Sequence, residues 1–393
     1  MNQKRVLIVG AGAAGLTAGI MAAEEGATVT ILEHNEKPGK KIAATGNGKC
    51  NLTNLQMPAD AYRGSDIRIV KEIFRKFSPE DTLHFFEKIG IYPVSKNGYV
   101  YPRSGQASSV TDLLCMKAKS LGVKIKTREH VTGLSRNQQG WYVQTEGWHY
   151  ESDAVILANG SSASNIAGAD GSGYELAAGL GHKIIEPLPA LVPLKCRKKS
   201  LSAWSGVRTE GKVTLYIDGK ETASSTGELQ LTDYGISGIP VFQVSRYAVR
   251  ALKEKKKVSA ALNFLPDLSE ENLQAMLLER QKNCPYKSPK ELFIGLFPEK
   301  LSKVLCEQKD PLQAISKFPL EISGYLSYEH AQICSGGVSV DEIDFRTLES
   351  RLQKGLYFAG ELLDIDGICG GYNLQWAWSS GAVAGRCAAK ENL

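Results

Sequence analysis

The sequence predicts an α/β protein with a doubly wound parallel sheet, into which a β-barrel and a helical segment are inserted. Residues 5–160 alternate between short apolar strands and helical stretches, and the same alternating pattern returns near the C-terminal end. The intervening residues change first to strands and then to helical spacing. Because 393 residues exceed what one core usually supports, we expect several domains. They are a discontinuous domain of residues 1–186 and 326–393, a β-barrel-like domain of residues 187–265 and a helical insert of residues 266–325.

A glycine-rich turn follows the first apolar strand. Residues 6–9 are Val-Leu-Ile-Val, and Gly10, Gly12 and Gly15 then form a G-x-G-x-x-G pattern ahead of a small-residue helix. In dinucleotide sites these glycines make a tight turn, admit the pyrophosphate to the backbone and let the helix lie close to the strand. The next strand ends at Glu33, whose carboxylate suits ribose hydroxyls and would repel a 2′-phosphate. The pattern predicts FAD or NAD at this site rather than NADP.

The same segment has a second interpretation. Residues 6–23 carry no charge and follow Lys4 and Arg5, as in signal peptides and short membrane helices. The four glycines, the β-branched start and the spacing of Glu33 favour the strand-turn-helix. A membrane-spanning helix needs ~20 predominantly apolar residues, and no other stretch of the chain approaches that. We therefore expect a soluble, cytoplasmic protein.

Composition narrows the class of protein further. The hydrophobic fraction of 42% is ordinary for a globular protein, and the net charge of +5 comes partly from basic clusters at residues 195–199 and 250–257. These clusters predict solvated loops or helix ends, so nucleic acid is not an expected partner. The eight cysteines lack C-x-x-C spacing, and the six histidines lack H-x-x-x-H spacing. We expect reduced thiols and no metal site.

The loop after Glu33 is both glycine-rich and basic. Residues 37–51 include Gly46 and Gly48, which allow close backbone approach, and Lys40, Lys41 and Lys49, which can offset the charge of a diphosphate. We expect this loop to wrap the phosphates and the ribityl chain of a cofactor.

The following elements complete the predicted sheet. Because ligands of such folds bind at the carboxyl ends of the strands, a strand that ends at Asn159-Gly160 is placed next to the first glycine turn. The expected elements are helices within 66–90 and 108–121, a hairpin at 92–102 that turns at Asn97-Gly98, a strand at 124–127, a β-meander through 141–150 as the crossover, and a strand at 154–158.

The middle of the chain has a different order of predicted strands and helices. Strands are expected at residues 191–195, 212–218 and 227–232, followed by a glycine- and proline-containing turn at 235–240. Apolar residues at helical spacing then predict helices at 269–284 and 289–307.

A second glycine-rich turn lies near the C-terminal end. A strand at 331–338 precedes another at 356–359, which ends at Gly360-Glu361. A loop with three glycines leads to a helix that starts near Asn373. A helix N-terminus carries partial positive charge, which suits the N1/C2=O edge of a reduced flavin. The two glycine turns together favour FAD over NAD alone.

These residues resemble a known family, the bacterial BaiN/RdsA-type (YhiN-like) NAD(P)/FAD-dependent oxidoreductases, which includes aminoacetone-oxidase-like flavoproteins. The resemblance spans essentially the whole chain and implies a glutathione-reductase-like FAD-binding domain with the two inserts. Two positions depart from the family pattern: Asn159-Gly160 replaces Thr-Gly-Gly, and Cys334 replaces threonine. The motifs that carry the resemblance are the first glycine turn and residues 39–51, 232–238, 336–338, 355–361 and 370–375.

The resemblance also implies which residues contact FAD. They are Gly10, Gly12, Ala14, Gly15, Glu33, Lys41, Gly46, Gly48, Asn51, Val131 (through its backbone), Ala158, Gly360, Glu361, Asn373 and Leu374.

The chemistry expected of such a protein is hydride transfer between flavin N5 and a small organic substrate. Cys50 has no cysteine partner in its segment, so a disulfide reductase is not expected. Without a second G-x-G-x-x-G domain, NAD(P)H would bind transiently in the substrate cleft. We expect Tyr372 or Trp376 to line the substrate face, since both lie between the glycine loop and the C-terminal helix.

Two other functions remain open at this point. In the first, O2 reoxidises the flavin of an oxidase that acts on small amines or aminoketones such as aminoacetone. In the second, the flavin is structural, and the basic insert makes the chain a binding protein.

Overall fold

The computed structural model describes residues 3–58, 60–166, 168–197 and 201–390. The chain divides into two compact units. The larger unit combines Met1–Pro187 with Ile333–Leu393, and the barrel unit is Leu188–Gln332.

A five-stranded parallel sheet forms the centre of the larger unit, which confirms the predicted doubly wound α/β fold. Its strand order is β20-β11-β1-β2-β7. The apolar run of β1 is buried because strands lie on both sides of it and helices cover it. The strands are β1 (Arg5–Val9), β2 (Thr28–Glu33), β7 (Lys124–Thr127), β11 (Ala154–Leu157) and β20 (Leu356–Phe358).

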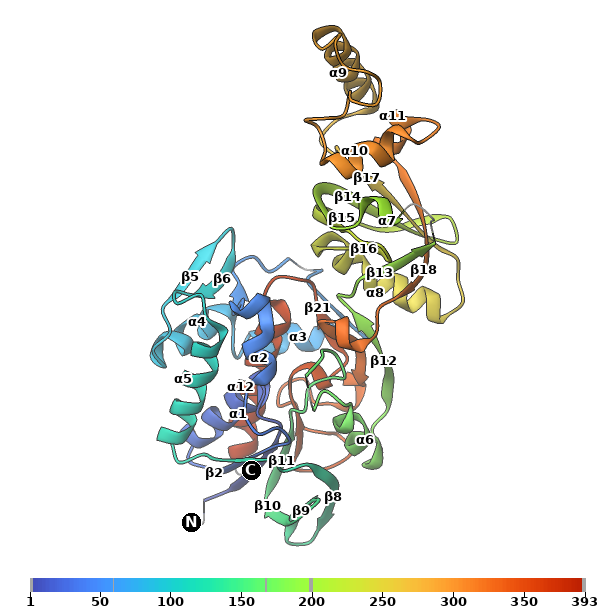
Figure 1. Ribbon diagram of the computed structural model, residues 1–393. Helices are drawn as coiled ribbons and strands as arrows, with labels where there is room; N and C mark the ends of the chain where they lie inside the picture. The colour runs from blue at the N-terminus through green and yellow to red at the C-terminus, as the bar shows by residue number, and fades with distance from the viewer. Residues whose placement is uncertain (1–2, 59, 167, 198–200, 391–393) are drawn as a thin grey trace. The chain divides into compact units, whose positions relative to one another are not determined.

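Two helices from opposite ends of the chain pack closely against each other in this unit. They are α1 (Ala13–Glu24) and α12 (Tyr372–Ala389), which Figure 1 shows side by side. A Cβ atom on Gly381 would lie 2.4 Å from the carbonyl oxygen of Ala14, and one on Gly385 would lie 2.3 Å from that of Ala18. Small residues on both helices therefore allow contact between their backbones.

No helix of the described residues combines the length and the apolar character needed to cross a bilayer.

Smaller elements surround the sheet. The hairpin turns at Asn97 and Gly98, whose φ angles of 53° and 87° are both positive, as a type I′ turn requires. The helices are α2 (Lys40–Ala44), α3 (Arg68–Phe74), α4 (Pro79–Lys88), α5 (Ala107–Ser120) and α6 (Ser172–Gly179), with 3-10 turns η1 (Thr45–Gly48), η3 (Val340–Glu342) and η4 (Gly360–Leu362). The strands are β3 (Thr53–Asn54), β4 (Tyr62–Gly64), β5 (Pro93–Lys96), β6 (Tyr99–Pro102), the meander β8 (Val131–Asn137), β9 (Gly140–Thr145) and β10 (His149–Ser152), β12 (Ile184–Ala190), β19 (Ile333–Val338) and β21 (Ile365–Gly367).

The barrel unit contains a closed barrel of six strands in the order β13-β16-β15-β14-β17-β18. The barrel encloses an apolar core that includes Leu215, Leu229 and Phe318. Its strands are β13 (Leu194–Arg197), β14 (Val207–Ile217), β15 (Lys220–Leu231), β16 (Gly235–Ser237), β17 (Val258–Asn263) and β18 (Phe318–Tyr325).

The helices of the barrel unit differ from the sequence-based expectation in three places. Residues 318–325, expected in the helical insert, form β18, whose alternating burial is that of a barrel strand. The expected turn at 235–240 leads into a long helix, because Pro240 occupies its first turn, where proline is tolerated. The stretch 289–298 contains turns rather than a helix. The helices are α7 (Leu201–Trp204), α8 (Ile239–Lys253), α9 (Glu270–Asn283), α10 (Glu299–Cys306) and α11 (Pro311–Ser316), with 3-10 turn η2 (Tyr328–His330); α10 and α11 lie between the barrel strands and α9 (Figure 1).

The two basic clusters both belong to the barrel unit. Arg250–Lys253 form the last turn of α8, and Lys255 has a left-handed φ of 59° in the turn that follows. In the other cluster, Lys198 and Lys199 lie outside the described residues.

Candidate dinucleotide and flavin site

The three glycines of the first turn have three different environments. Gly10 has a φ of 100°, and a Cβ there would lie 2.6 Å from the carbonyl oxygen of Ala158. A Cβ on Gly15 would lie 1.9 Å from the carbonyl oxygen of Gly10, so helix α1 needs glycine to approach β1. Gly12 has a φ of −82°, and a Cβ there would meet no protein atom within 4 Å. Neither backbone conformation nor protein packing requires glycine at position 12, whereas close approach of a ligand would.

A pocket opens at this turn along the carboxyl ends of the parallel strands. Of the residues expected to contact FAD, it is lined by Gly10, Gly12, Glu33, Lys41, Val131 and Ala158. The N-terminus of α1 faces the turn and has no side-chain cap, so its first N–H groups have no side-chain acceptor. These are the features that bind phosphate groups at helix N-termini.

Glu33 is buried at the edge of this pocket. Its Oε2 accepts a hydrogen bond of 2.7 Å from the backbone N–H of Ala11. Its Oε1 accepts two bonds of 2.8 Å from Asn35, one from the backbone and one from the side-chain amide. The carboxylate thus fixes the glycine turn relative to the end of β2, and its charge still faces the pocket.

A polar cluster joins the basic loop to the end of β20. Lys41 Nζ lies 2.7 Å from Glu361 Oε2. The other oxygen of Glu361 accepts hydrogen bonds from Ser161 Oγ at 2.6 Å and from the backbone N–H of Cys334 at 3.1 Å. Two predicted contact residues, Lys41 and Glu361, are therefore partners of each other, and the backbone N–H of Cys334 belongs to the same cluster.

The loop between α2 and β3 has an unusual backbone. Gly46, Asn47, Gly48 and Cys50 have φ angles of 55°, 53°, 81° and 57°. Left-handed conformations are costly for residues other than glycine, and they concentrate at functional sites. A Cβ on Gly48 would meet no protein atom within 4 Å, which leaves room for close approach of a ligand.

The N-terminus of α12 meets this loop. Its N-cap, Gly371, has a φ of 95° and offers no side-chain cap. A Cβ there would lie 2.7 Å from the backbone of Thr53 and 3.0 Å from Asn51 Oδ1, an oxygen that is buried and has no hydrogen-bond partner. The glycine-rich basic loop and the second glycine-rich turn are thus in contact, although they are far apart in the sequence.

Hydrogen bonds from α12 hold the two segments together. Trp378 Nε1 donates to the carbonyl oxygen of Leu52 at 2.9 Å, and Thr53 Oγ1 donates to Gln375 Oε1. Asn373 bonds both the N–H and the carbonyl of Gly367, at 2.7 and 2.9 Å, and so fixes the loop before the helix. Leu374, another predicted contact, packs partly buried against the core.

The two residues predicted for the substrate face lie mostly in the interior. The Tyr372 hydroxyl donates to the carbonyl oxygen of Gln56 at 2.8 Å, and the Trp376 indole N–H donates to that of Gly360 at 3.0 Å. Tyr372 is 5% exposed and Trp376 is 1% exposed. In this structure both side chains support the loops around the α12 N-terminus.

The buried cysteines of this region are protonated at neutral pH. Burial raises the pKa of the Cys50 thiol to about 11 and that of Cys334 to about 12. All eight cysteines of the chain are free. These thiols are poor nucleophiles, because thiol–disulfide exchange requires the thiolate.

Two histidine networks were not anticipated from the sequence. His34 and His130, which flank Glu33 and Val131, stack with ring centroids 4.4 Å apart and planes at 9°. Asp170 lies near them, and one ligand-type atom from each of the three falls within 4.8 Å of the others. Two histidines that bind one metal ion through their ring nitrogens each hold the ion close to their own ring plane, so the two planes must meet at the ion. The planes of His34 and His130 are nearly parallel, which is the geometry of stacked rings and not of metal ligands.

The second network lies next to β20, where the His182 ring packs against Phe358 with centroids 4.8 Å apart. His182 is buried between Glu342 Oε2, at 3.1 Å from Nδ1, and Ser350 Oγ, at 2.8 Å from Nε2. Burial lowers the pKa of His182, and Glu342 partly opposes this effect. Its partners are about 160 residues away in the sequence, so no local motif could have indicated them.

The residues present fit FAD. Gly12 and Gly48 leave space that no protein side chain uses, the α1 and α12 N-termini lack side-chain caps, and Asn51 presents a buried acceptor without a partner. An uncapped helix N-terminus at each end of the site suits a ligand with a diphosphate at one end and an electron-rich ring edge at the other.

Comparison with known proteins agrees with this assignment. Residues 4–387 match the HI0933-like protein Rossmann domain family. The chain is 42% identical to a 3-dehydro-bile acid delta(4,6)-reductase of Clostridium scindens, over 98% of this chain and 99% of that protein. It is 30% identical to a ribosomal RNA dihydrouridine synthase of Haemophilus influenzae, over 95% and 96% of the two chains.

A solved structure resembles the fold. The 3-ketosteroid-delta4-(5alpha)-dehydrogenase of Rhodococcus jostii matches with a TM-score of 0.53 and 16% sequence identity, over 99% of this chain and 97% of that one. This likeness concerns the fold alone. From its residues, its site and its full-length relatives, the chain belongs to the HI0933-like family and is a flavin-dependent oxidoreductase.

Proposed function

We propose that the cofactor is FAD and that the described pocket holds its adenosine and diphosphate. Gly10, Gly12 and the α1 N-terminus would bind the diphosphate, and Glu33 and the Val131 backbone would bind the adenosine part. Gly46, Gly48, Asn51 and the α12 N-terminus would surround the ring system. The remaining contacts implied by the family resemblance are Ala14, Gly15, Lys41, Ala158, Gly360, Glu361, Asn373 and Leu374.

We further propose that the enzyme saturates a carbon–carbon double bond conjugated to a carbonyl group. The names of the two relatives describe reactions of this type, one on a bile acid and one on uridine in rRNA. When bound, FAD would supply the hydride carrier, with NAD(P)H as the transient donor. The single observation that carries the proposal is the 42% identity over nearly the full length of both chains.

The chain's own residues would orient the ring and exclude water. The uncapped α12 N-terminus would stabilise negative charge on the adjacent ring edge. Tyr372 and Trp376 would shape the substrate face as positioning residues, through their bonds to Gln56 and Gly360. Tyr372→Phe and Trp376→Phe each remove one such bond, and turnover and substrate KM that stay unchanged in both variants would argue against this role.

The identity of the substrate is open between a small molecule and RNA. The expectation that nucleic acid is not a partner loses its support, since a relative of similar length acts on ribosomal RNA. The interpretation as a binding protein without activity also loses support, because the full-length relatives are enzymes.

Anaerobic spectroscopy tests the proposal. The purified protein should carry the absorption bands of a flavin, NADH or NADPH should bleach them, and a steroid enone or a uridine-containing rRNA fragment should restore them. A flavin that small amines bleach, and that yields peroxide with O2, would instead identify the oxidase. A protein without flavin that does not bind added FAD would refute the cofactor assignment.

A further inference from the structure

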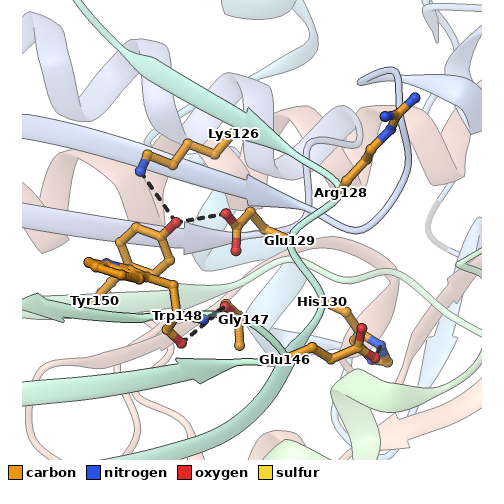
Figure 2. Close-up of a pocket in the computed structure, with 9 residues that line it drawn as sticks. Lys126, Arg128, Glu129, His130, Glu146, Gly147, Trp148 and Tyr150 are labelled. Atoms are coloured by element: carbon orange, nitrogen blue, oxygen red, sulfur yellow. Dashed lines mark hydrogen bonds and ion pairs between the residues drawn. The ribbon is translucent and has the colours of Figure 1, made fainter.

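A second pocket lies next to the turn that follows β7, and Figure 2 shows the side chains that line it. It has a volume of about 350 Å³, enough for a small ligand. Its walls are β7 with the following turn and the β9–β10 turn with Tyr150. Glu129 and His130 line both pockets, so the two sites share one wall.

An exposed tryptophan stands over this pocket on a fixed backbone. The Trp148 carbonyl accepts hydrogen bonds from the backbone N–H of Thr145 at 2.8 Å and from Thr145 Oγ1 at 3.0 Å. The Trp148 N–H donates to Thr145 Oγ1 at 3.1 Å. The Trp148 residue is nevertheless 63% exposed, whereas the other four tryptophans of the chain are buried. A rigidly held, exposed aromatic face suits stacking with a planar ring.

The aromatic surface continues along the β9–β10 hairpin. The Trp148 and His149 rings are nearly parallel at 9°, with centroids 5.9 Å apart, and His149 stacks on Tyr142 at 4.8 Å. Lys126 Nζ lies 4.7 Å from the centre of the Tyr150 ring. The pocket itself combines the Trp148 and Tyr150 rings with the Lys126 cation, and His149 and Tyr142 extend the aromatic surface outside it.

Hydrogen-bonding groups of both signs are fixed beside these rings. The Tyr150 hydroxyl donates to Glu129 Oε1 at 2.8 Å and accepts from Lys126 Nζ at 3.3 Å, as Figure 2 shows. Glu129 Oε2 has no hydrogen-bond partner among the described residues, so it can accept from a ligand. On the opposite side, Glu146 lies 3.3 Å from His130 Nδ1.

The turn that carries the cations is fixed to the central sheet. Arg128 has a left-handed φ of 60°, and its N–H donates to the carbonyl oxygen of Asn35 at 3.0 Å. The N–H of Glu129 donates to that of Glu33 at 2.9 Å. The side chain of Lys126 is exposed, so its ammonium group can meet an anion at the rim of the pocket. The Arg128 side chain points away from Lys126 (Figure 2), and its guanidinium lies 3.9 Å from Glu36 Oε2.

We propose that this pocket binds a nucleotide unit, with its base on Trp148 and its phosphate on Lys126. An N–H group of the base, N6–H of adenine or N3–H of uracil, would donate to Glu129 Oε2, which explains a carboxylate beside the aromatic rings. A phosphate ion alone would not use the indole, and an apolar ligand would leave the charged groups without partners. The nucleotide is either free in solution or part of an RNA strand.

Titration of the FAD-loaded protein with AMP, UMP and a ten-nucleotide RNA tests this proposal. FAD-loaded protein is used so that the dinucleotide pocket is filled. Fluorescence of the single exposed tryptophan and calorimetry should both show saturable binding. Trp148→Leu should weaken binding at least about fivefold, as base–aromatic stacking contributes. Lys126→Met should weaken it and lower the salt dependence of RNA binding by about one phosphate contact.

Tyr92→Leu is the matched control, because it removes a 71% exposed aromatic side chain elsewhere in the same unit. The FAD content of all variants should stay that of the wild type. RNA binding at least tenfold tighter than that of either mononucleotide identifies the strand as the source, and equal binding identifies the free nucleotide. No binding of any probe, or equal binding by wild type, Trp148→Leu and Lys126→Met, would overturn the proposal.

Discussion

Gly12→Ala is expected to separate cofactor binding from stability. The added Cβ meets no protein atom within 4 Å, and the φ of −82° is ordinary for alanine. Since alanine reduces the conformational entropy of the unfolded chain, apo-protein stability should stay unchanged or rise by about 0.4–1 kcal/mol. The affinity for FAD should fall at least about tenfold, which is ~1.4 kcal/mol, because the methyl group takes the space through which a diphosphate would reach the backbone.

Two further glycines provide matched comparisons. Gly15→Ala places a Cβ 1.9 Å from the carbonyl oxygen of Gly10, so α1 must shift away from β1. This variant should lose about 1–3 kcal/mol of apo-protein stability as well as FAD affinity. Gly179→Ala, at the end of α6, also meets no atom within 4 Å, so it should raise apo-protein stability by a similar amount and leave FAD affinity unchanged.

Urea unfolding of the apo-proteins measures stability, and quenching of flavin fluorescence measures the Kd for FAD. Apo-proteins are needed because bound cofactor raises the apparent stability by mass action. Wild-type FAD affinity in Gly12→Ala would refute the reasoning, as would a loss of apo-protein stability equal to that of Gly15→Ala.

Three other predictions follow from the described contacts. Glu361→Gln weakens the bond of this side chain to Lys41. Because both side chains are partly exposed, we expect the free energy of unfolding in urea to fall by about 1 kcal/mol. A change within error would show that the ion pair does not stabilise the protein. Burial lowers the pKa of His182 in the folded state, so the unfolded state binds a proton first as pH falls below about 6.5. The free energy of unfolding should therefore decrease below that pH, and it should decrease less in His182→Gln. Equal pH dependence of the two proteins would contradict this. With a pKa of about 11, Cys50 should resist alkylation by iodoacetamide at pH 7.5 in the native protein and react after unfolding. Peptide mass spectrometry can follow the labelling. Rapid labelling of Cys50 in the native protein would show that its thiol is accessible and ionised.

The sequence was most informative where local chemistry determines structure. The glycine turn, Glu33 at the end of β2 and the Asn97-Gly98 hairpin have signals within a few residues, and the structure contains each of them. Helix α8 was not predicted, because glycine and proline before it indicate a turn, whereas proline in the first turn of a helix costs no hydrogen bond. Strand β18 was assigned to the helical insert, although its burial alternates with period two.

The interactions within the site were less predictable than its residues. Lys41 and Glu361 were both expected at the cofactor, but their bond to each other joins positions 320 residues apart. The hydrogen bonds between Trp378 and Leu52 and between His182 and Glu342 also join positions that are far apart in the sequence. Such pairs depend on how the chain returns to the sheet, which no local pattern encodes. Aromatic residues posed a related problem, since Tyr372 and Trp376 near a glycine loop can face a ligand or pack inward.

The contact between α1 and α12 has a consequence for synthesis on the ribosome. Strand β1 and helix α1 emerge early, but the helix that covers Ala14 and Ala18 is translated only after the whole barrel unit. The nascent chain must therefore keep the small-residue face of α1 uncovered for most of translation, a situation that favours chaperone binding. Cofactor loading should then be a late, post-translational event, whereas the barrel unit can fold co-translationally.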